Sequence, residues 1–570
     1  MTLRSLAFYG MLAAGMAAHA EPPPRPPIDS VPMAPIDSAP EVKLDLPVTA
    51  GPFAPTWESI ERNYPGTPAW LRDAKFGIWV HFGPQAAGMS GDWYARKMYV
   101  PGTTAYNNHL RTYGHPSVAG YKEVLRDWNP VKLDPARLTD IYKDAGARFL
   151  IVQGVHHDNF DLWNSRYQPW NSTRIGPKRD LVGEWSRAAR AAGIRYGVAF
   201  HHEYSWWWWQ TAFGSDTQGD RAGVPYDGNL TLADGKGKWW EGLDPALLYN
   251  VDLREYKGVT EAAYSPWNPP PAGLFGRHTA YATWYATRWA QRIMDVVEHY
   301  DPDFIYTDGT GPQPFSGSHT GTGIRADATQ RVIADFYNQT LKKRGKVDTF
   351  SIIKFRPDTN GTVNTEEGTI PAGIKSDQAW IAEVPVGDWY YGPDFTYDSG
   401  AVIHYLLEQV ARDGNAAICI SPLPDGSLDD GSVRMLKEIG AWMRINGQGI
   451  YGSKAWRVLG EGENGKLRTL PGGSIGKRQA EFRFGPADFR FTVGKDGALY
   501  AFSMAVPAPG SEIRIASLGA AANLLGKPVG AVSLLGHQGA PLRWKQEADA
   551  LVISAPASMP FATAVAFRIE

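Results

Sequence analysis

The chain has 570 residues, more than a single hydrophobic core usually supports, so at least two domains are expected. Its 57 basic and 59 acidic residues nearly cancel, and no basic stripe interleaved with aromatic residues occurs, so a nucleic-acid partner is not expected. Aromatic residues make up 12% of the chain, which fits either a β-rich core or aromatic platforms for an amphipathic ligand such as a sugar.

The amino-terminal region has the pattern of an export signal. Arg4 precedes an apolar stretch, and Ala18-His19-Ala20 has the small-x-small form of a cleavage site, so residues 1–20 are predicted to be a signal peptide. We therefore expect a periplasmic or extracellular protein. A membrane partner is not expected, because no later apolar stretch reaches the roughly 18 residues that a span requires. Residues 21–55 are dense in proline and are predicted to form a semi-rigid linker.

From Trp57 onward, amphipathic helical segments alternate with apolar strands, and polar groups follow each strand. This order predicts an α/β fold with a (β/α)8-like, TIM-type barrel over residues 56–456, closed by a last amphipathic helix from Ser432 to Ile445. The apolar run around Cys419 predicts that this sole cysteine is buried. The predicted strands are Phe76 to Phe82, Phe149 to Val152, Arg195 to Phe200 and Phe304 to Asp308.

The sequence pattern changes after Trp456. Short alternating runs such as AEFRFG, ALYAFSMAV and TAVAFRIE are separated by Gly, Pro and Asp, which is typical of an antiparallel β-sandwich. We therefore expect a carboxy-terminal β-sandwich domain over residues 457–570.

Histidines gather after three of the predicted strands, where a parallel barrel carries its active site. Clustered histidines could bind zinc. However, the chain has no HExxH helix, and adjacent strand residues such as His156 and His157 point to opposite faces unless a bulge or turn intervenes. The set fits sugar hydroxyls and an aromatic wall better, so neither a metal nor a cofactor is expected. The polar groups are His81 with Trp93 soon after it, His156, His157, His201, His202, Glu203, Tyr204 and Asp308.

Asp308 follows a buried strand and precedes Gly309, which leaves space near its carboxylate. It could cap a turn, or it could be the nucleophile of a glycosidase. A retaining glycosidase needs a second carboxyl group roughly 5 to 5.5 Å away. The candidates are Glu366 and Glu367 in NTEEGTIPAG, followed by Glu383 and Asp388.

Several motifs together resemble the α-L-fucosidases of glycoside hydrolase family 29, in order and spacing. They are KFGIWVHFGP, GDWYARKMY, GVHHDNFDLWNS, DFIYTDG and WIAEVPVGDWYYG, and the resemblance runs from about Trp57 to Trp456. It implies a barrel followed by a β-sandwich, no metal, and retaining hydrolysis of a fucose-containing glycan through a covalent fucosyl-enzyme. It also implies that Asp308 is the nucleophile and that fucose is bound by His81, Trp93, His156 and His157.

Other positions depart from the family pattern. The strand end GVAFHHEYSWWWW replaces a Tyr-rich element, so either His201 or His202 could face the sugar, with Tyr204 nearby. IKFRPD replaces the NDRW element, with Arg356 as the counterpart of its arginine.

Two further features remain open from the sequence. The family's Glu-x-Gly pattern overlays Glu366-Glu367-Gly368 and leaves both glutamates as candidates for the acid/base. Residues 206–285 resemble an insertion, which could wall additional subsites or form a lid.

Three functions are compatible with these features. The first is an exported, exo-acting, retaining α-L-fucosidase that removes terminal α-L-fucose from oligo- or polysaccharides; an endo-acting fucan hydrolase is its close alternative. The second is a metal-dependent hydrolase on a barrel scaffold. The third is a carbohydrate-binding protein that uses the same pocket without catalysis. The oligomeric state does not follow from the sequence.

Overall fold

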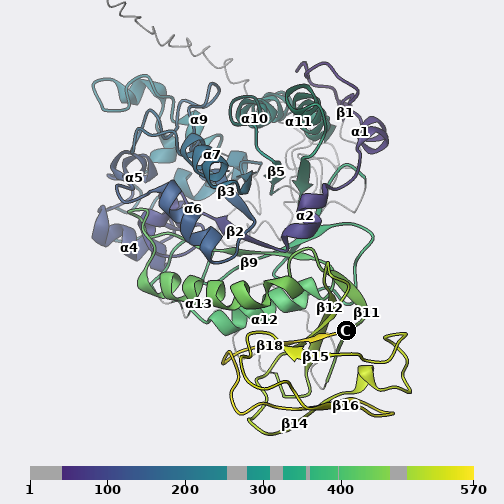
Figure 1. The fold of residues 1–570 in the computed structure, drawn as a ribbon. Coiled ribbons are helices and arrows are strands. Elements are labelled where there is room, and N and C mark those ends of the chain that lie inside the picture. Colours follow the sequence, from purple (N-terminus) through teal and green to yellow (C-terminus); the bar gives the residue numbers. More distant parts are fainter. Residues whose placement is uncertain are drawn as a thin grey trace, which may run out of the picture.

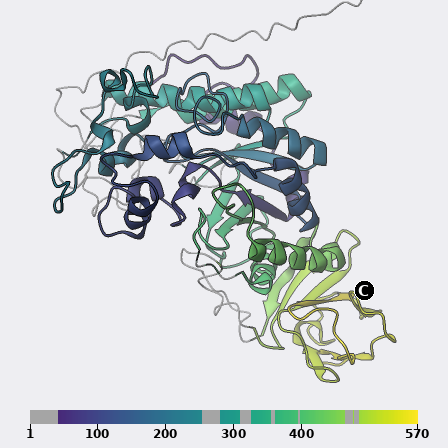
Figure 2. The ribbon, with the colours of Figure 1, turned by 90° about the vertical axis from the view of Figure 1, so that its left-hand side faces the viewer.

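The computed structural model describes residues 41–203, 205–252, 254, 279–308, 325–354, 360–393, 395, 397–462, 475 and 484–570. They form a barrel with flanking helices and a smaller β domain at the carboxyl end (Figure 1 and Figure 2). The predicted signal peptide, Tyr204 and Arg356 lie outside the described residues.

An eight-stranded sheet forms the barrel, in the order β7-β5-β4-β3-β2-β10-β9-β8. Every neighbouring pair in it is parallel. A parallel bridge between Ile352 and Val363 joins the two edges of the sheet, so the barrel closes. The strands are β2 (Phe76–Val80), β3 (Phe149–Val155), β4 (Arg195–Phe200), β5 (Phe304–Thr307), β7 (Phe350–Ile353), β8 (Asn364–Glu367), β9 (Trp380–Pro385) and β10 (Asn415–Cys419).

Helices surround the sheet, and their ends follow local sequence signals (Figure 1). The Asp134 side chain accepts a hydrogen bond from the Arg137 backbone N–H at the start of α6, and Gly193 ends α7 with a φ of 65°. The larger helices are α6 (Pro135–Asp144), α7 (Leu181–Ala192), α10 (Thr279–Tyr300), α11 (Ala328–Arg344), α12 (Ser399–Val410) and α13 (Asp430–Asn446). The shorter ones are α1 (Trp57–Asn63), α2 (Ala69–Ala74), α3 (Tyr94–Lys97), α4 (Thr104–Thr112), α5 (Tyr121–Asp127), α8 (Ser205–Trp208) and α9 (Ala246–Tyr249).

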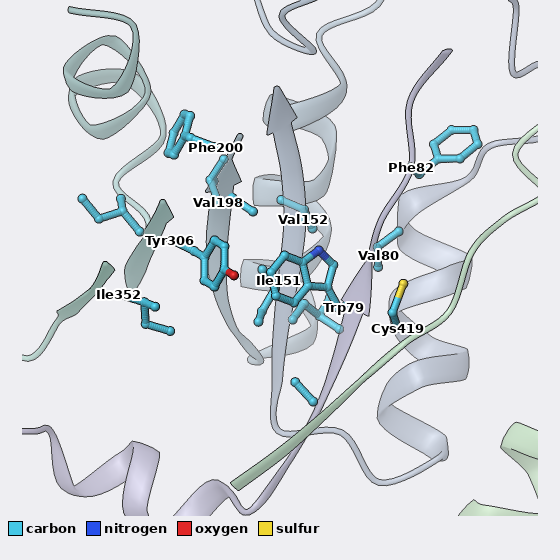
Figure 3. Close-up of a cluster of buried hydrophobic side chains, with 14 of the residues drawn as sticks. Trp79, Val80, Phe82, Ile151, Val152, Val198, Phe200, Tyr306, Ile352 and Cys419 are labelled. Carbon is cyan, nitrogen blue, oxygen red and sulfur yellow. The ribbon is translucent and has the colours of Figure 1, made fainter. Parts of the chain in front are cut away.

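Packed side chains fill the barrel below its polar end (Figure 3). Trp79 and Tyr306 meet edge to face with ring centroids 4.7 Å apart, and both are buried together with Ile151. Cys419 is a free, buried cysteine, as predicted. Tightly packed cores hold their side chains in fixed positions, so this layer supports the polar groups at the strand ends.

A bulge near the end of β3 changes the direction of the side chains that follow. Gln153 pairs with Ala199 and Val155 with Phe200, so one extra residue, Gly154, is inserted. A Cβ on Gly154 would lie 2.8 Å from the Val198 side chain, which explains the glycine. β3 ends at Val155 and His157 begins a turn, so the adjacent histidines after the strand do not alternate as strand residues do and can reach one site.

Part of the segment assigned to the linker lies on the barrel. β1 (Glu41–Val42) pairs in parallel with β6 (Arg325–Ala326), and the chain then follows α11. The Leu44 N–H donates to Asp327, 2.9 Å away, and the Phe53 N–H donates to Asn338, 3.1 Å away. Residues 41–55 are therefore anchored to the barrel by backbone hydrogen bonds.

The carboxy-terminal domain is a sandwich of two antiparallel sheets, which confirms the predicted fold class. Phe491 and Phe567 from one sheet and Ile513 and Leu551 from the other belong to one buried cluster. The first sheet has the order β11 (Lys454–Glu461), β12 (Phe489–Val493), β13 (Leu499–Ser503), β18 (Val565–Ile569) and β15 (Val532–Leu534). The second has the order β14 (Glu512–Ile515), β17 (Leu551–Ser554) and β16 (Trp544–Gln546).

Helices α12 and α13 lie between the barrel and the sandwich (Figure 1). Glu408 of α12 is buried and pairs with Arg490 of β12 and with Arg412, each at 2.5 Å. The Trp442 indole N–H of α13 donates to the Ala564 carbonyl, 2.8 Å away. Among the described residues, no helix has both the length and the apolar character of a membrane span.

Candidate active site

The candidate site lies at the carboxyl ends of the barrel strands, where sites of this fold occur. Because the strands are parallel, residues far apart in the chain meet there. The site residues follow or end their strands: His81 after β2, His156 and His157 after β3, His201 after β4, Asp308 after β5, Lys354 after β7 and Glu367 at the end of β8.

His81, His156 and His201 form a compact cluster, which we call the histidine cluster. The ring centroid of His156 lies 4.8 Å from that of His81 and 4.7 Å from that of His201. All three rings are buried, and burial lowers the pKa of each well below its ordinary value. The rings are therefore neutral near pH 7 and can act as hydrogen-bond partners without charge.

His157 lies between the histidine cluster and Asp308. Its Nε2 is 3.6 Å from Asp308 Oδ2, and its Nδ1 is 2.7 Å from the His201 carbonyl oxygen. Burial lowers its pKa to about 4, although the Asp308 charge opposes this shift. His157 is thus also neutral near pH 7.

His202 has a different environment from His201. Its ring stacks on Trp289 of α10 at 6.0 Å, and its Nε2 lies 3.3 Å from the Trp289 carbonyl oxygen. Of the two alternatives, His201 joins the cluster and His202 packs against α10, in agreement with the alternation of neighbouring side chains.

Two carboxylates meet at one cation. Lys354 Nζ lies 2.6 Å from Asp308 Oδ1 and 2.8 Å from Glu367 Oε2. The two oxygens are therefore no more than about 5.4 Å apart, within the separation typical of retaining glycosidases. Burial opposes the charge of Lys354, but Asp308, Glu367 and Glu383 raise its pKa, and it remains a cation.

The Glu366 carboxylate has other partners than Lys354. Lys375 Nζ lies 3.1 Å from its carboxylate, and the Thr369 hydroxyl donates to it, 3.0 Å away. Adjacent residues of a strand face opposite sides, so only one of this pair can reach Asp308. The structure brings Glu367 to that position.

Two further carboxyl groups lie near Asp308 and Lys354. Burial raises the pKa of Glu383 to about 8, and the Tyr306 hydroxyl donates to this group from 2.8 Å. Glu203 is fully buried, and burial and the Asp308 charge raise its pKa well above the ordinary value. A retained proton on either group limits the negative charge around Asp308 near neutral pH.

Aromatic side chains border the site. The Trp93 ring meets His157 edge to face at 5.9 Å, and Trp389 lies 5.3 Å from His81. Trp93 has a left-handed backbone with φ 66°, a conformation that bulky residues adopt only when the surroundings impose it. Its N–H donates to the Asp92 carboxylate, 2.8 Å away, which fixes the turn.

Asp92 places another carboxyl group beside the cluster. Its Oδ1 is 3.9 Å from His156 Nε2. Burial raises the pKa of Asp92 to about 8, with a further contribution from Asp388. Asp388 itself follows β9 and accepts a hydrogen bond from the Trp389 N–H, 2.8 Å away.

Four polar side chains of the site were not predicted. Lys354 ends the apolar run IIK, so the rule that polar groups follow barrel strands could have identified it. Asp92 directly precedes the predicted Trp93. Gln85 and Gln153 contact the ring nitrogens of His156 and His201. Gln153 directly follows the apolar run of its strand, as the histidines do soon after, whereas nothing in the sequence marks Gln85.

The spacing of the histidine cluster would permit a metal ion, because one nitrogen from each ring can be chosen so that all lie within 4.8 Å of one another. The groups behind the rings do not fit this role. Metal-bound histidines usually donate their second N–H to a carbonyl or carboxylate. Here amide nitrogens, which can only donate, lie against Nδ1 of His156 and Nδ1 of His201.

A parallel barrel with two carboxylates at this separation, beside neutral hydrogen-bonding rings and tryptophan walls, defines a glycoside hydrolase. The alpha-L-fucosidase family model matches residues 42–448, more than half of the chain. The chain belongs to the alpha-L-fucosidase family.

Known relatives agree with this assignment. The tissue alpha-L-fucosidase of Rattus norvegicus is 25% identical over 423 residues, which cover 72% of this chain and 74% of the relative. An alpha-L-fucosidase of Dictyostelium discoideum is 24% identical over 422 residues, with 71% and 76% covered. The solved structure of the Thermotoga maritima alpha-fucosidase has a TM-score of 0.60 and 23% identity, and covers 90% of this chain and 100% of its own. The structural likeness supports the shared fold.

Proposed function

We propose that the protein is exported and removes terminal α-L-fucose from fucosylated oligo- or polysaccharides, with retention of anomeric configuration. The observation that carries the mechanism is the short distance between Asp308 and Glu367 through Lys354. Two carboxyl groups this close leave no room for a water on the opposite face of the sugar, so one of them must attack directly.

The reaction has two displacements. In the first, Asp308 forms a bond to the anomeric carbon while Glu367 transfers its proton to the departing glycosidic oxygen. In the second, Glu367 takes a proton from water, the resulting hydroxide attacks the anomeric carbon, and the bond to Asp308 breaks. Splitting one difficult displacement into two easier ones is the physical benefit of the covalent route.

Lys354 has an electrostatic role in this sequence. Its cation lies against Asp308 and places a positive charge beside the attacking carboxylate in a buried setting. It also contacts Glu367, whose charge alternates between the two steps. A fixed cation that serves both carboxylates needs no rearrangement during the reaction.

The histidine cluster and Trp93 supply the binding surface. Buried neutral rings can bond sugar hydroxyls, and an indole can cover the apolar face of the ring. The enclosed cluster, with exposures of 2%, 3% and 5% for His81, His156 and His201, favours one terminal sugar over an internal unit. The amino-terminal pattern at residues 1–20 favours export.

The first test is release of free fucose from an aryl α-L-fucoside and from a panel of natural linkages and a fucan. We expect fucose as the sole sugar released, initially as the α-anomer by proton NMR. Oligosaccharides from the fucan would support endo-action instead, and the β-anomer would contradict retention. Activity should survive exhaustive chelation, whereas loss that zinc restores would support the metal-dependent alternative.

The second test replaces the nucleophile. Asp308→Ala should lower turnover by at least about 10⁴-fold, because the covalent route is lost. Circular dichroism and thermal unfolding should show a folded protein, since Asp308 lies at a strand end and not in the packed core. Near-normal turnover in this variant would reject the mechanism.

A further inference from the structure

Two glutamines lie directly behind the histidine cluster, and backbone groups fix the direction of their amides. The Ala95 N–H donates to Gln85 Oε1, 3.3 Å away, so Gln85 Nε2 is the end that lies 2.6 Å from His156 Nδ1. Gln153 Nε2 donates to the Val155 carbonyl, 2.5 Å away, and lies 3.0 Å from His201 Nδ1. Because an N–H only donates and a carbonyl only accepts, neither amide can be reversed without losing a bond.

These amide directions determine where the protons of the neutral rings lie. An amide nitrogen only donates, so Nδ1 of His156 and Nδ1 of His201 must accept, and each ring carries its proton on Nε2. The Val155 carbonyl oxygen does not serve as an alternative acceptor for a proton on His201 Nδ1. Its two lone pairs are already taken by the His201 backbone N–H, at 2.9 Å, and by Gln153.

His157 has the opposite arrangement. Its Nδ1 lies 2.7 Å from the His201 carbonyl oxygen, which can only accept. The proton of neutral His157 is therefore on Nδ1, and its Nε2 presents a lone pair on the side of Asp308. His81 completes the set, because neither of its ring nitrogens has a partner among the described residues and both roles remain open to it.

We propose that Gln85 and Gln153 are positioning residues that make His156 and His201 hydrogen-bond donors and thereby exclude a metal ion. With His157 as an acceptor, the pocket presents a fixed pattern of two donors and one acceptor to sugar hydroxyls; this part rests on the proposed function. A metal ion at the histidine cluster would need the Nε2 lone pairs of His156 and His201. Each ring would then carry its proton on Nδ1, where that proton would face the amide hydrogens of the glutamine behind the ring.

Neutron diffraction from crystals of the full-length protein tests the proton positions directly. We expect deuterium on Nε2 of His156 and His201, and on Nδ1 of His157. Deuterium on Nδ1 of His156 or His201 would overturn the proposal. This measurement uses the unaltered protein and no fucoside, so its outcome is independent of whether the proposed function holds.

Metal binding tests the second consequence. Gln85→Glu replaces an amide donor by a carboxylate of the same shape, which can accept the Nδ1–H of a metal-bound His156 ring. Gln153 stays unchanged, because a carboxylate there would face the Val155 carbonyl, which cannot donate. The Gln85→Glu variant should bind Co²⁺ at least about tenfold more tightly than the unaltered protein and show the visible absorption of a tetrahedral site. Equal Co²⁺ affinity in both proteins would overturn the proposal.

Two controls make the metal test specific. His81→Ala in the Gln85→Glu variant should abolish the gained Co²⁺ affinity, which assigns the ion to the histidine cluster. Gln85→Met, of similar size but without donor or acceptor, should not gain the affinity that Gln85→Glu gains. If Gln85→Met gained it equally, removal of the amide alone would be the cause, and the proposed role of a carboxylate partner would be wrong.

Kinetics with an aryl α-L-fucoside distinguish a positioning role of Gln85 from a purely structural one. Gln85→Met should raise KM several-fold while kcat changes less, because the proton on His156 is no longer fixed before binding. A fall in kcat alone, with KM unchanged, would contradict the positioning role. If no fucoside is hydrolysed by the unaltered protein, the proposed function fails, and the neutron and Co²⁺ results still decide the proton positions.

Discussion

The pocket has a charged side and a neutral side, built from different strands of one barrel. On the charged side, Lys354 lies within 2.8 Å of both Asp308 and Glu367. On the neutral side, His81 and His156 are buried and uncharged, because burial lowers the pKa of each ring. Burial acts against the charge on both sides, but only Lys354 has carboxylates beside it that raise its pKa and keep it charged.

The difference separates two tasks. The charged side must stabilise a change of charge during the reaction, which requires a fixed counter-ion close to the reacting groups. The neutral side must recognise sugar hydroxyls, whose charge does not change during the reaction. This task requires hydrogen bonds of defined direction and not a strong electrostatic field. Variants that disturb the charged side should therefore affect kcat, and variants of the neutral side should affect KM.

The largest effect within this comparison is expected from Glu367→Gln. The variant cannot protonate a departing sugar oxygen, so kcat on natural fucosides should fall by about 10²- to 10⁴-fold. An aryl fucoside with a good leaving group should lose less in its first step. Glu366→Gln is the matched comparison, since Glu366 pairs with Lys375 at 3.1 Å, and it should retain most activity. The reverse result would assign the acid/base to Glu366.

The buried histidines should contribute a part of the stability that is lost in acid. In the unfolded chain His157 binds a proton near pH 6.5, but in the folded protein its pKa is lowered to about 4. Between these values the unfolded state holds more protons, so the free energy of unfolding falls as the pH falls, by about 3 kcal/mol for this residue alone. His81, His156 and His201 shift in the same direction.

NMR signals of the His157 ring, followed between pH 7 and pH 4, measure this effect directly. Thermal unfolding alone does not isolate it, because Asp92 and Glu383, whose pKa values burial raises to about 8, change the free energy of unfolding in the opposite direction. A ring that titrates near pH 4 supports a neutral, buried His157, whereas titration near pH 6.5 would contradict the distinction between the two sides.

A smaller effect is expected from Lys354→Met. Removing the cation leaves two carboxylates no more than about 5.4 Å apart without a counter-charge, so the change of charge during the reaction is no longer stabilised. We expect kcat to fall by about 10²-fold. Lys354→Arg should restore part of the activity. Lys375→Met, which removes a lysine beside Glu366, should leave the rate unchanged.

Four of the eight barrel strands, β2, β3, β4 and β5, could be predicted because each is an apolar run that ends at a polar group. β8 has the sequence NTEE and carries no such signal. Parallel strands bring their carboxyl ends together, so the sequence also predicts His81, His156, His157 and Asp308 at one end. Lys354 likewise follows an apolar run, FSII. A single lysine there has no meaning until β5 and β8 place two carboxylates beside it.

Other features depend on geometry that the sequence does not contain. The choice between Glu366 and Glu367 depends on which face of β8 points inward, and both faces carry a glutamate. Strand alternation argues against His156 and His157 sharing a site, and this objection does not apply because β3 ends at Val155 and His157 lies in a turn. The glutamines behind the rings could not be predicted, because their role depends on contacts across the barrel.

The smallest effect is expected on the neutral side, from His201→Asn. The shorter side chain removes the Nε2–H donor of His201 but no charge, so KM should rise by about tenfold, the worth of one neutral hydrogen bond, and kcat should change less. His202→Asn is the matched variant one residue away. Its ring packs on Trp289 of α10, so this change should lower the unfolding temperature and leave KM close to its original value. If His202→Asn raised KM and His201→Asn did not, the sugar-facing ring would be His202, and the neutral side would have to include a residue that the fold directs toward α10.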